Sequence, residues 1–302
     1  WVALREKSRR RCRVVVCLDE WDGALMARRT VRERRAYWRR HWMHPLEDNY
    51  YPWVERLLPR ADLVVSTSTF LQRKFGGVVV RMGVDTDRFV PLPPEKKNAV
   101  RVELGLSPEH RVIVFGGVVR PHKGVEIILQ ALRQAVDSRW RLLVIGPMTD
   151  ALAELKKGPA GEQILALGAK PAKEMPYWLG AGDLSVLPMS NDLLAQSQVP
   201  CKVFESMAMG LPVLAGDVSD LPEIVAGAGN VFPAGDSAAL ASILRRWGSD
   251  PDFMRRQGEQ ARGRCVNHFS CAVMERELCG QMEALARRSD DQGFQGDAGI
   301  RF

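Results

Sequence analysis

A glycine-rich loop with two cationic side chains is the first part of this sequence that could do chemistry. The loop reads Gly116-Gly117-Val118-Val119-Arg120-Pro121-His122-Lys123-Gly124 and follows an apolar run, Arg111–Phe115. Glycines let the phosphates of a ligand approach the backbone, and Arg120 and Lys123 add fixed positive charge facing such an anion. The spacing does not match the fingerprint of dinucleotide-binding loops. The loop therefore predicts a phosphate site, and a surface turn with solvated cations is the alternative.

A second candidate anion site follows further along the chain, in the stretch Ser197–Ala215. Here a polar loop leads into a predicted helix, and Pro200 stands near the first helical position, where its missing N–H costs nothing. The helix has one apolar stripe at helical spacing, made of Val203, Phe204, Met207 and Ala208. Free N–H groups at the start of a helix attract anions, and Glu205 lies just over one turn inside. The alternative is an ordinary helix packed on a strand, with Glu205 solvated.

Two carboxylates, Asp19 and Glu20, come directly after the apolar run Arg13–Leu18. At the end of a strand they could orient the hydroxyl group of an acceptor, or they could cap the start of a helix. Both interpretations stay open, and the first makes this pair the candidate acceptor side of the site.

The elements that must position these residues alternate between strands and helices. Apolar runs of strand length recur at 13–18, 61–68, 78–80, 111–115, 141–145, 163–167, 184–187 and 213–215. Helical patterns between them, such as Val125–Ala135 and Met175–Leu179, predict βαβ units and parallel sheets covered on both faces. Right-handed crossovers then give a doubly wound α/β domain, whose ligand sites lie at the carboxyl ends of the strands. The glycine-rich loop and the loop containing Ser197 both leave such strand ends.

The chain of 302 residues is long enough for two domains. The proline-rich segment Pro91–Pro94 is typical of a stiff linker. We therefore expect a first lobe over 1–92, a second lobe over 93–266, a C-terminal helix over 267–288 and a polar, disordered tail over 289–302.

Together these motifs resemble the donor-binding signature of retaining glycosyltransferases with the two-lobed B fold, the large family-four group. Pro200-Cys201-Lys202-Val203-Phe204-Glu205 matches one version of its helix motif, and Gly83-Val84-Asp85-Thr86-Asp87-Arg88-Phe89 matches the usual end of its first lobe. The resemblance covers about Ala61 to Phe269. Two positions depart from it. Ser197 stands where many members have a second glutamate, and Arg120 lies closer to the lysine than in many members.

The resemblance implies an α/β fold of two Rossmann-like lobes. It also implies metal-independent transfer of a sugar, with retention, from a nucleotide-diphosphate donor to an acceptor hydroxyl. In the family's pattern Lys123 and Arg120 would hold the diphosphate and Glu205 would bind the ribose, which makes these three the candidate catalytic residues. Backbone groups around Ala169 and Pro171 would hold the base. The full implied donor site is Gly116, Gly117, Ala169, Pro171, Ser197, Val199, Pro200, Lys202 and Glu205. No metal, and no cofactor beyond the donor substrate, is expected.

Two other functions stay open. Nucleotide-sugar 2-epimerases share the two-lobed architecture, although they need carboxylates and a histidine in the cleft. A chain without the first strands of its first lobe could also be a non-catalytic nucleotide-sugar binding fragment. The chain opens at Trp1, and the first part of the family's first lobe has no counterpart, so we expect an N-terminally truncated transferase with an incomplete first lobe.

A basic segment rich in aromatic residues carries much of the formal charge of +7. From Arg28 to Arg40, seven arginines face a single glutamate, and tryptophan and tyrosine are interleaved or follow. Such a segment suits an anionic membrane surface or a solvated helix face, and it carries no nucleic-acid recognition motif. The expected partners are a nucleotide sugar and a glycan or lipid-linked acceptor, with no nucleic acid.

The composition bears on the compartment. An apolar fraction of 46% is that of a globular protein, and there is no apolar run of about 18 residues that would span a membrane. The six cysteines lack metal-site spacing and mostly occupy apolar patterns, so we expect reduced, buried thiols. We therefore expect a cytoplasmic protein, with a peripheral position at the inner membrane face as the alternative.

Overall fold

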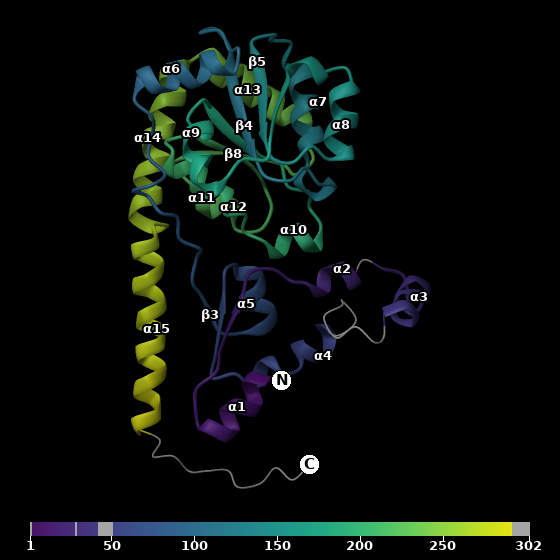
Figure 1. Cartoon of the computed structure of the whole chain (residues 1–302), viewed down its shortest axis with the longest axis vertical. Coiled ribbons are helices and arrows are strands. Elements are labelled where there is room, and N and C mark those ends of the chain that lie inside the picture. The colour runs from purple at the N-terminus through teal and green to yellow at the C-terminus, as the bar shows by residue number, and fades with distance from the viewer. Residues whose placement is uncertain (1, 28, 42–50, 292–302) are drawn as a thin grey trace.

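The computed structural model describes residues 2–27, 29–41 and 51–291, and every structural statement below refers to these. The chain forms two α/β lobes, which Figure 1 shows one above the other, with a long C-terminal helix running beside the first lobe. Each lobe contains a parallel sheet. The expected α/β class with two lobes of parallel strands is therefore confirmed.

The first lobe is built on a small sheet in the order β1-β2-β3. Its strands are β1 (Val15–Leu18), β2 (Leu63–Ser66) and β3 (Val78–Val79). Its helices are α1 (Val2–Arg10), α2 (Gly23–Ala27), α3 (Val31–His41), α4 (Tyr51–Glu55) and α5 (Thr69–Phe75), with a 3-10 helix at Leu58–Arg60. Arg28 and the residues 42–50, which belong to or follow the basic segment, lie outside the described residues.

The second lobe contains a six-stranded parallel sheet in the order β6-β5-β4-β7-β8-β9. Its strands are β4 (Arg111–Gly116), β5 (Trp140–Ile145), β6 (Ile164–Gly168), β7 (Leu184–Leu187), β8 (Val213–Gly216) and β9 (Gly229–Phe232). The chain adds strands on one side of β4 as far as β6 and then returns to the other side with β7. The loops that leave β4 and β7 therefore diverge, and such a switch point opens a crevice for ligands in parallel sheets.

Helices cover both faces of this sheet. They are α6 (Pro94–Glu103), α7 (Val125–Ala135), α8 (Asp150–Lys157), α9 (Met175–Leu179), α10 (Leu193–Ser197), α11 (Lys202–Ala208), α12 (Leu221–Ile224), α13 (Ser237–Gly248) and α14 (Pro251–His268). Short 3-10 helices lie at Pro121–Lys123, Gly161–Gln163 and Ala172–Glu174. Helix α15 (Cys271–Asp291) then leaves this lobe and runs beside the first one (Figure 1).

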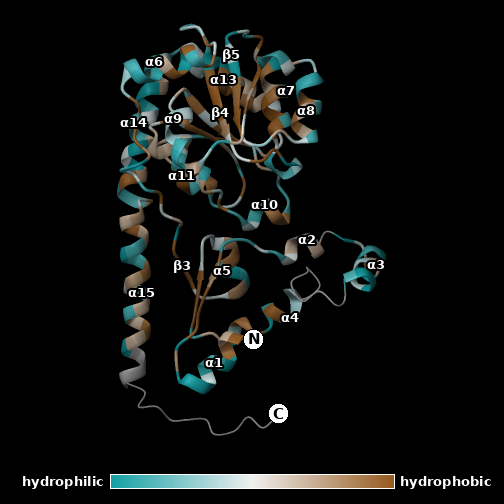
Figure 2. Ribbon diagram, viewed as in Figure 1, coloured by the Kyte–Doolittle hydropathy of each residue, from teal (hydrophilic) through white to brown (hydrophobic). Residues whose placement is uncertain are grey.

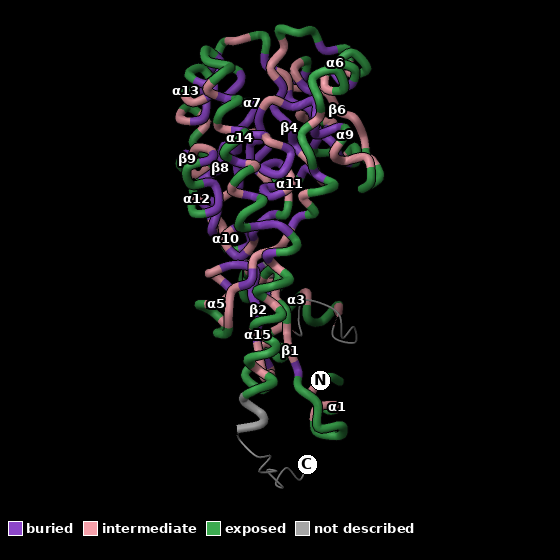
Figure 3. The backbone as a smooth tube through the Cα atoms, turned by 90° about the vertical axis from the view of Figure 1, so that its left-hand side faces the viewer, coloured by how far each residue is buried: buried purple, intermediate pink, exposed green. Residues whose placement is uncertain are grey.

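The core follows the alternation of side chains along the strands. Ile113 and Val144 face α7 and α13, whereas Val112 and Leu143 belong to the apolar cluster with α9, α11 and α14. Figure 2 shows these strands as apolar, and Figure 3 shows that the buried residues are concentrated in the second lobe. The second lobe therefore provides a rigid frame for the loops at its switch point.

Some elements differ from the expectations. Pro94 opens helix α6 where a linker was expected, because proline is well suited to the first helical position. Helix α11 begins at Lys202, with Cys201 as its N-cap, so Pro200 precedes the helix. Helix α14 passes through the expected domain boundary at 266. Helix α15 extends over 289–291 of the expected tail, and 292–302 lie outside the described residues.

The cysteines correct another expectation. All are free thiols, but only Cys265 is buried, so the expectation of buried thiols is wrong for the other five. Cys17 lies on the edge strand β1, Cys201 at the start of α11, and Cys279 on the exposed surface of α15. Apolar neighbours in sequence do not bury a residue when its own face meets solvent. Within the described residues, no helix combines the length and apolar character that crossing a membrane requires.

Candidate active site

The glycine-rich loop after β4 and the loop after β7 meet at the switch point of the second sheet. Lys123 Nζ donates to Gln198 Oε1, between α10 and α11, over 3.1 Å. The backbone N–H of Ser190 donates to His122 O over 3.1 Å. The two predicted anion-binding loops therefore form one continuous surface.

Two glycines allow the first loop to turn tightly enough for this contact. Gly117 has a φ of +116°, and its N–H donates to Ile145 O on the neighbouring strand over 2.8 Å. Gly124 has a φ of +64°, and a Cβ atom there would lie 2.0 Å from Pro188 O in the loop after β7. Side chains other than glycine rarely adopt these angles, so close approach of the two loops depends on glycine at both positions.

Lys123, Lys202 and Glu205 form a charged cluster where the loops meet. Burial lowers the pKa of Lys123, and the charge of Arg120 lowers it further. Burial together with the charge of Lys123 lowers the pKa of Lys202 to about 7, against the opposing charge of Glu205. Burial raises the pKa of Glu205 although Lys202 opposes the shift. Two lysines with lowered pKa values mark a place where an added anion would be stabilised.

Carboxylates of the first lobe reach the same surface. Glu20 Oε2 accepts a hydrogen bond from Gln198 Nε2, so Gln198 bridges Glu20 and Lys123. Asp19 is exposed beside it, and its charge acts on the thiol of Cys201 at the start of α11. The structure thus brings the two candidate acceptor-side carboxylates next to the predicted donor loops, although Glu20 and Gln198 are 178 positions apart in the chain.

Ser197 has a different environment from the other predicted donor residues. Ser197 is fully buried, and its hydroxyl group donates to Leu194 O over 2.9 Å. The same hydroxyl oxygen, Ser197 Oγ, accepts from the N–H of Trp21 over 3.2 Å. Its backbone O accepts from Ser68 Oγ over 3.0 Å. In this conformation Ser197 joins the two lobes, and contact with a donor sugar would require these hydrogen bonds to break.

Asp220 makes a second connection between the lobes that sequence reasoning did not find. Its carboxylate accepts from the N–H of Thr69 over 2.7 Å and also from the Thr69 hydroxyl group and from Arg81. Arg81 further pairs with Glu223 over 3.2 Å. Asp220 is the N-cap residue of α12, yet its side chain makes no capping bond there and accepts from the first N–H of α5 in the other lobe, where Ser68 is the N-cap. The sequence around Asp220 does not indicate these contacts, because Thr69 and Arg81 are 151 and 139 positions away in the chain.

The remaining predicted donor residues surround this surface. Arg120 is exposed, as are Ala169 and Pro171 after β6. A Cβ atom on Gly116, at the end of β4, would lie 3.4 Å from Met175 Cε. Val199 and Pro200, just before α11, are buried. Arg88, which the analysis of the sequence did not assign to the site, donates to Ala172 O and opposes the raised pKa of Glu205. It therefore ties the predicted base loop to the cluster.

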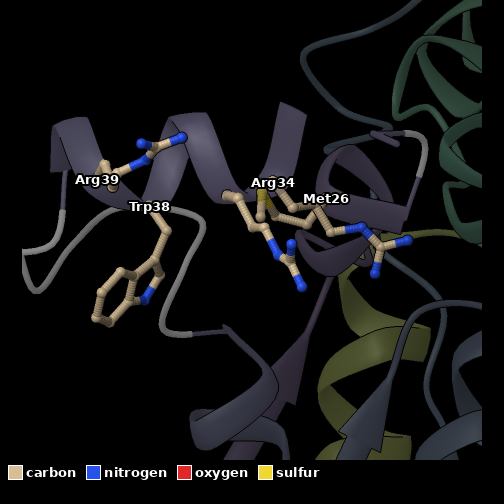
Figure 4. A pocket seen from close by; sticks show the side chains of 5 residues that line it. Met26, Arg34, Trp38 and Arg39 are labelled. Atoms are coloured by element: carbon tan, nitrogen blue, oxygen red, sulfur yellow. The ribbon is translucent and has the colours of Figure 1, made fainter. Parts of the chain in front are cut away.

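Two hollows lie away from this surface. One, of about 660 Å³, lies in the first lobe against α2 and α3; Figure 4 shows its side chains, which are Met26, Arg34, Arg35, Trp38 and Arg39. The other, of about 800 Å³, lies between α6 and α14 and is lined in part by Lys97, Arg101 and Glu259. Over the described part of the chain, no three His, Cys, Asp or Glu side chains gather as a metal site would require.

Comparison with known proteins identifies the second lobe. Residues 109–250 match the family of glycosyl transferases group 1. The chain is 31% identical over 213 residues to the D-inositol 3-phosphate glycosyltransferase of Streptomyces avermitilis, covering 64% of this chain and 43% of that protein. It is 27% identical over 251 residues to the lipopolysaccharide core biosynthesis mannosyltransferase LpsB of Rhizobium meliloti, covering 78% of this chain and 69% of that protein.

The fold is shared with solved structures. The crystal structure of Anabaena HepE in complex with UDP-glucose superposes with a TM-score of 0.73 at 19% sequence identity, over 94% of this chain and 75% of that one. This likeness establishes the two-lobed B fold of glycosyltransferases. The chain spans less than half the length of the Streptomyces relative and about two thirds of the Rhizobium one.

Proposed function

Because this chain contains a group 1 glycosyltransferase domain in a two-lobed B fold, we propose that it transfers a sugar from a nucleotide-diphosphate donor to an acceptor hydroxyl group. LpsB of Rhizobium meliloti is a mannosyltransferase of lipopolysaccharide core biosynthesis, and the proposed acceptor here is a glycan or a lipid-linked sugar. HepE binds UDP-glucose, and a nucleotide sugar of this kind is the proposed donor.

The observation that carries this proposal is the cluster of Lys123, Lys202 and Glu205 at the switch point. As the glycosidic bond breaks, the leaving diphosphate gains negative charge and the sugar becomes oxocarbenium-like. Cations such as Lys123 in a partly buried site stabilise that charge, and in this proposal they act without a metal ion. Lys123 and Arg120 hold the diphosphate, and Glu205 binds the ribose and so positions the donor. The transfer proceeds with retention.

The acceptor side of the proposal rests on Glu20 and Asp19. Both carboxylates come from the first lobe and lie at the edge of the donor surface, where Gln198 links Glu20 to Lys123. A carboxylate in this position accepts a hydrogen bond from an acceptor hydroxyl and holds it against the sugar. We propose that the second lobe extends from near residue 92 to near residue 266. The acceptor hydroxyl and the donor would then meet between the two lobes.

Two alternatives remain as outcomes of a test. The family match and both named relatives are transferases, which favours transfer over nucleotide-sugar 2-epimerisation. A non-catalytic binding module would bind the donor and transfer nothing. Assays of this chain with and without a longer N-terminal region, against a panel of nucleotide sugars, separate the three: transfer, a change of the sugar's configuration, or binding alone.

Glu205→Gln tests the assignment of the nucleoside contact. The amide keeps the shape but loses the charge that accepts strongly from ribose hydroxyls, so we expect the affinity for a nucleoside diphosphate to fall about tenfold. Affinity for inorganic pyrophosphate, which has no ribose, should not fall. Isothermal titration calorimetry measures both, with the exposed Glu277→Gln as the matched control. An equal loss for both ligands would mean that Glu205 supports α11 and does not touch the ribose.

The surface of α3 supports a second proposal, that the first lobe rests on an anionic membrane. Arg34, Arg35 and Arg39 line the same hollow as Trp38, which is 55% exposed. Figure 4 shows Arg34, Trp38 and Arg39 on α3. Arginine beside an exposed indole suits the phosphate groups and the interface of a lipid surface. The protein would then lie at the inner face of the membrane, where lipid-linked acceptors are found.

We expect the protein to sediment with vesicles containing phosphatidylglycerol and not with pure phosphatidylcholine vesicles, with binding that weakens as salt is added. The triple variant R34Q/R35Q/R39Q should lose about fivefold in affinity per arginine. The control R246Q/R255Q/R256Q removes the same charge from α13 and α14 and should bind as the wild type does. If both variants lost the same affinity for the vesicles, the binding would depend on the net charge alone. Helix α3 would then be a solvated surface without a specific role in binding the membrane.

A further inference from the structure

The ammonium group of Lys202 lies under the glycine-rich loop. Its Nζ atom is 4.2 Å from the centroid of the Phe115 ring, at the end of β4. A Cβ atom on Gly117 would lie 3.1 Å from the same nitrogen, so the absence of a side chain at Gly117 leaves room for it. Among the contacts of the described residues, no hydrogen bond or salt bridge satisfies this ammonium. Its capacity to donate hydrogen bonds is therefore unused beside the predicted phosphate site.

Charged groups from every neighbouring element act on this nitrogen or on its partners. Lys123 comes from the 3-10 helix of the glycine-rich loop, with Arg120 before it. Glu205 and Cys201 lie on α11 and at its start, and both oppose the effect of Lys123 on Lys202. The carboxylates Asp19 and Glu20 of the first lobe and the guanidinium of Arg88 complete the charged surroundings.

These surroundings make Lys202 unlike an ordinary surface lysine. Burial is the largest cause of its lowered pKa of about 7, and the positive charge of Lys123 is the second. Phe115 offers a ring face, which stabilises a cation but provides no acceptor for a hydrogen bond. A phosphate oxygen entering beside Lys123 would add negative charge next to Lys202 and would favour its protonated form.

We propose that Lys202 is a direct ligand of the donor's diphosphate and takes up a proton from solvent when that diphosphate binds. The inference rests on the proposed function, because it assigns a phosphate contact and a change of charge to one residue of the same site. The neutral amine gains one proton on binding and becomes an ammonium that donates to the phosphate oxygens. When the nucleoside diphosphate leaves, the ammonium returns the proton to solvent. Lys123 and Lys202 thus act together on the diphosphate.

The proposal predicts a pH dependence of binding. Above pH 7 the affinity of the wild type should fall, approaching about tenfold per pH unit, because each binding event must first supply a proton. Lys202→Arg keeps a cation that does not titrate in this range, so its affinity should change little with pH. Lys202→Met should bind weakly at every pH. A residue that only supported the fold would not turn a steep pH profile flat when replaced by arginine.

The test is calorimetric titration of UDP and of GDP at pH 8, in HEPES and in Tris. Because these buffers have different ionisation enthalpies, the difference in measured heat counts the protons taken up. We expect the wild type to take up about one proton more per ligand than Lys202→Arg, a difference that cancels any protons of the ligand itself. The exposed Lys157→Met, on α8, serves as the control and should match the wild type.

The outcomes separate this inference from the proposed function. Binding of UDP or GDP with equal proton uptake in the wild type and Lys202→Arg would overturn the inference and leave the proposed function intact. Proton uptake with inorganic pyrophosphate but no binding of either nucleotide would support the inference and contradict nucleotide-sugar binding. Absence of binding by all three ligands would overturn both.

Discussion

Lys123→Met should lower the affinity of this protein for a nucleoside diphosphate by about a hundredfold, because it removes a charge-assisted hydrogen bond to phosphate worth about 2–3 kcal/mol. Methionine keeps the length and apolar stem of lysine, so the packing of the 3-10 helix changes little. The loss should be larger in the rate of sugar transfer than in ground-state binding, because the diphosphate carries more charge in the transition state. Calorimetry with UDP or GDP measures the first effect, and a transfer assay with the preferred donor measures the second.

Lys157→Met is the matched control for this substitution. Lys157 is an exposed lysine at the end of α8 and pairs with Glu154, one turn earlier. The Lys157→Met protein should bind the nucleoside diphosphate and transfer the sugar as the wild type does. Gln198, which loses its partner in Lys123→Met, keeps its bond to Glu20, so circular dichroism should show an intact fold. A dissociation constant unchanged in a folded Lys123→Met protein would mean that the glycine-rich loop does not hold the diphosphate.

Asp183→Asn should lower the free energy of unfolding by about 3 kcal/mol, because it removes one side of a largely buried ion-pair network. Asp183 precedes β7 and pairs with Lys97 and Arg101 of α6 over 2.8 and 3.0 Å. It also accepts from the N–H of Val112 on β4 over 2.8 Å. Asparagine keeps the volume but leaves two cations without a counter-charge at the base of the second sheet. Urea unfolding of both proteins measures the difference.

The same substitution has a defined dependence on pH. Burial opposes ionisation of Asp183, but Lys97, Arg101 and the hydrogen bonds outweigh it, so its pKa is lowered in the folded protein. The folded state then holds its proton less tightly than the unfolded state does. The stabilisation is therefore complete above the unfolded-state pKa, near about 4, and is lost as the pH falls through the folded-state value. The difference in the free energy of unfolding between the wild type and Asp183→Asn should be constant at pH 6–8 and should become smaller below about pH 4. A gap that stays constant into acid would contradict the role of the charge.

The sequence by itself determined the second lobe and the nature of its loops. The strands predicted at 111–115, 141–145 and 184–187 lie within one residue of β4, β5 and β7, because continuous apolar runs have few alternatives to a buried parallel strand. The glycines and cations of the 116–124 loop are likewise visible in the sequence, and the φ of +116° at Gly117 is one that residues with a side chain rarely adopt. Such features depend on the residue and its near neighbours in the chain.

The tertiary structure alone decided how the two lobes meet. Ser197 appeared in the sequence as a donor contact, yet its hydroxyl group serves Trp21 and Leu194. Asp220 received no role from the sequence, yet it accepts from the first N–H of α5 and pairs with Arg81. Neither role has a local signal, because hydrogen bonds between residues this far apart depend on how whole lobes are oriented.

The charge state of Lys202 is another feature that only the tertiary structure decides. A lysine in sequence has a fixed charge at neutral pH, and only its position over Phe115, under Gly117 and beside Lys123 brings its pKa to about 7. Burial and the field of neighbouring charges are properties of packed atoms and not of residue order. The sequence therefore determined which cations and carboxylates the site contains, and the packing of two lobes around one switch point decided which of them carry charge and which hold the lobes together.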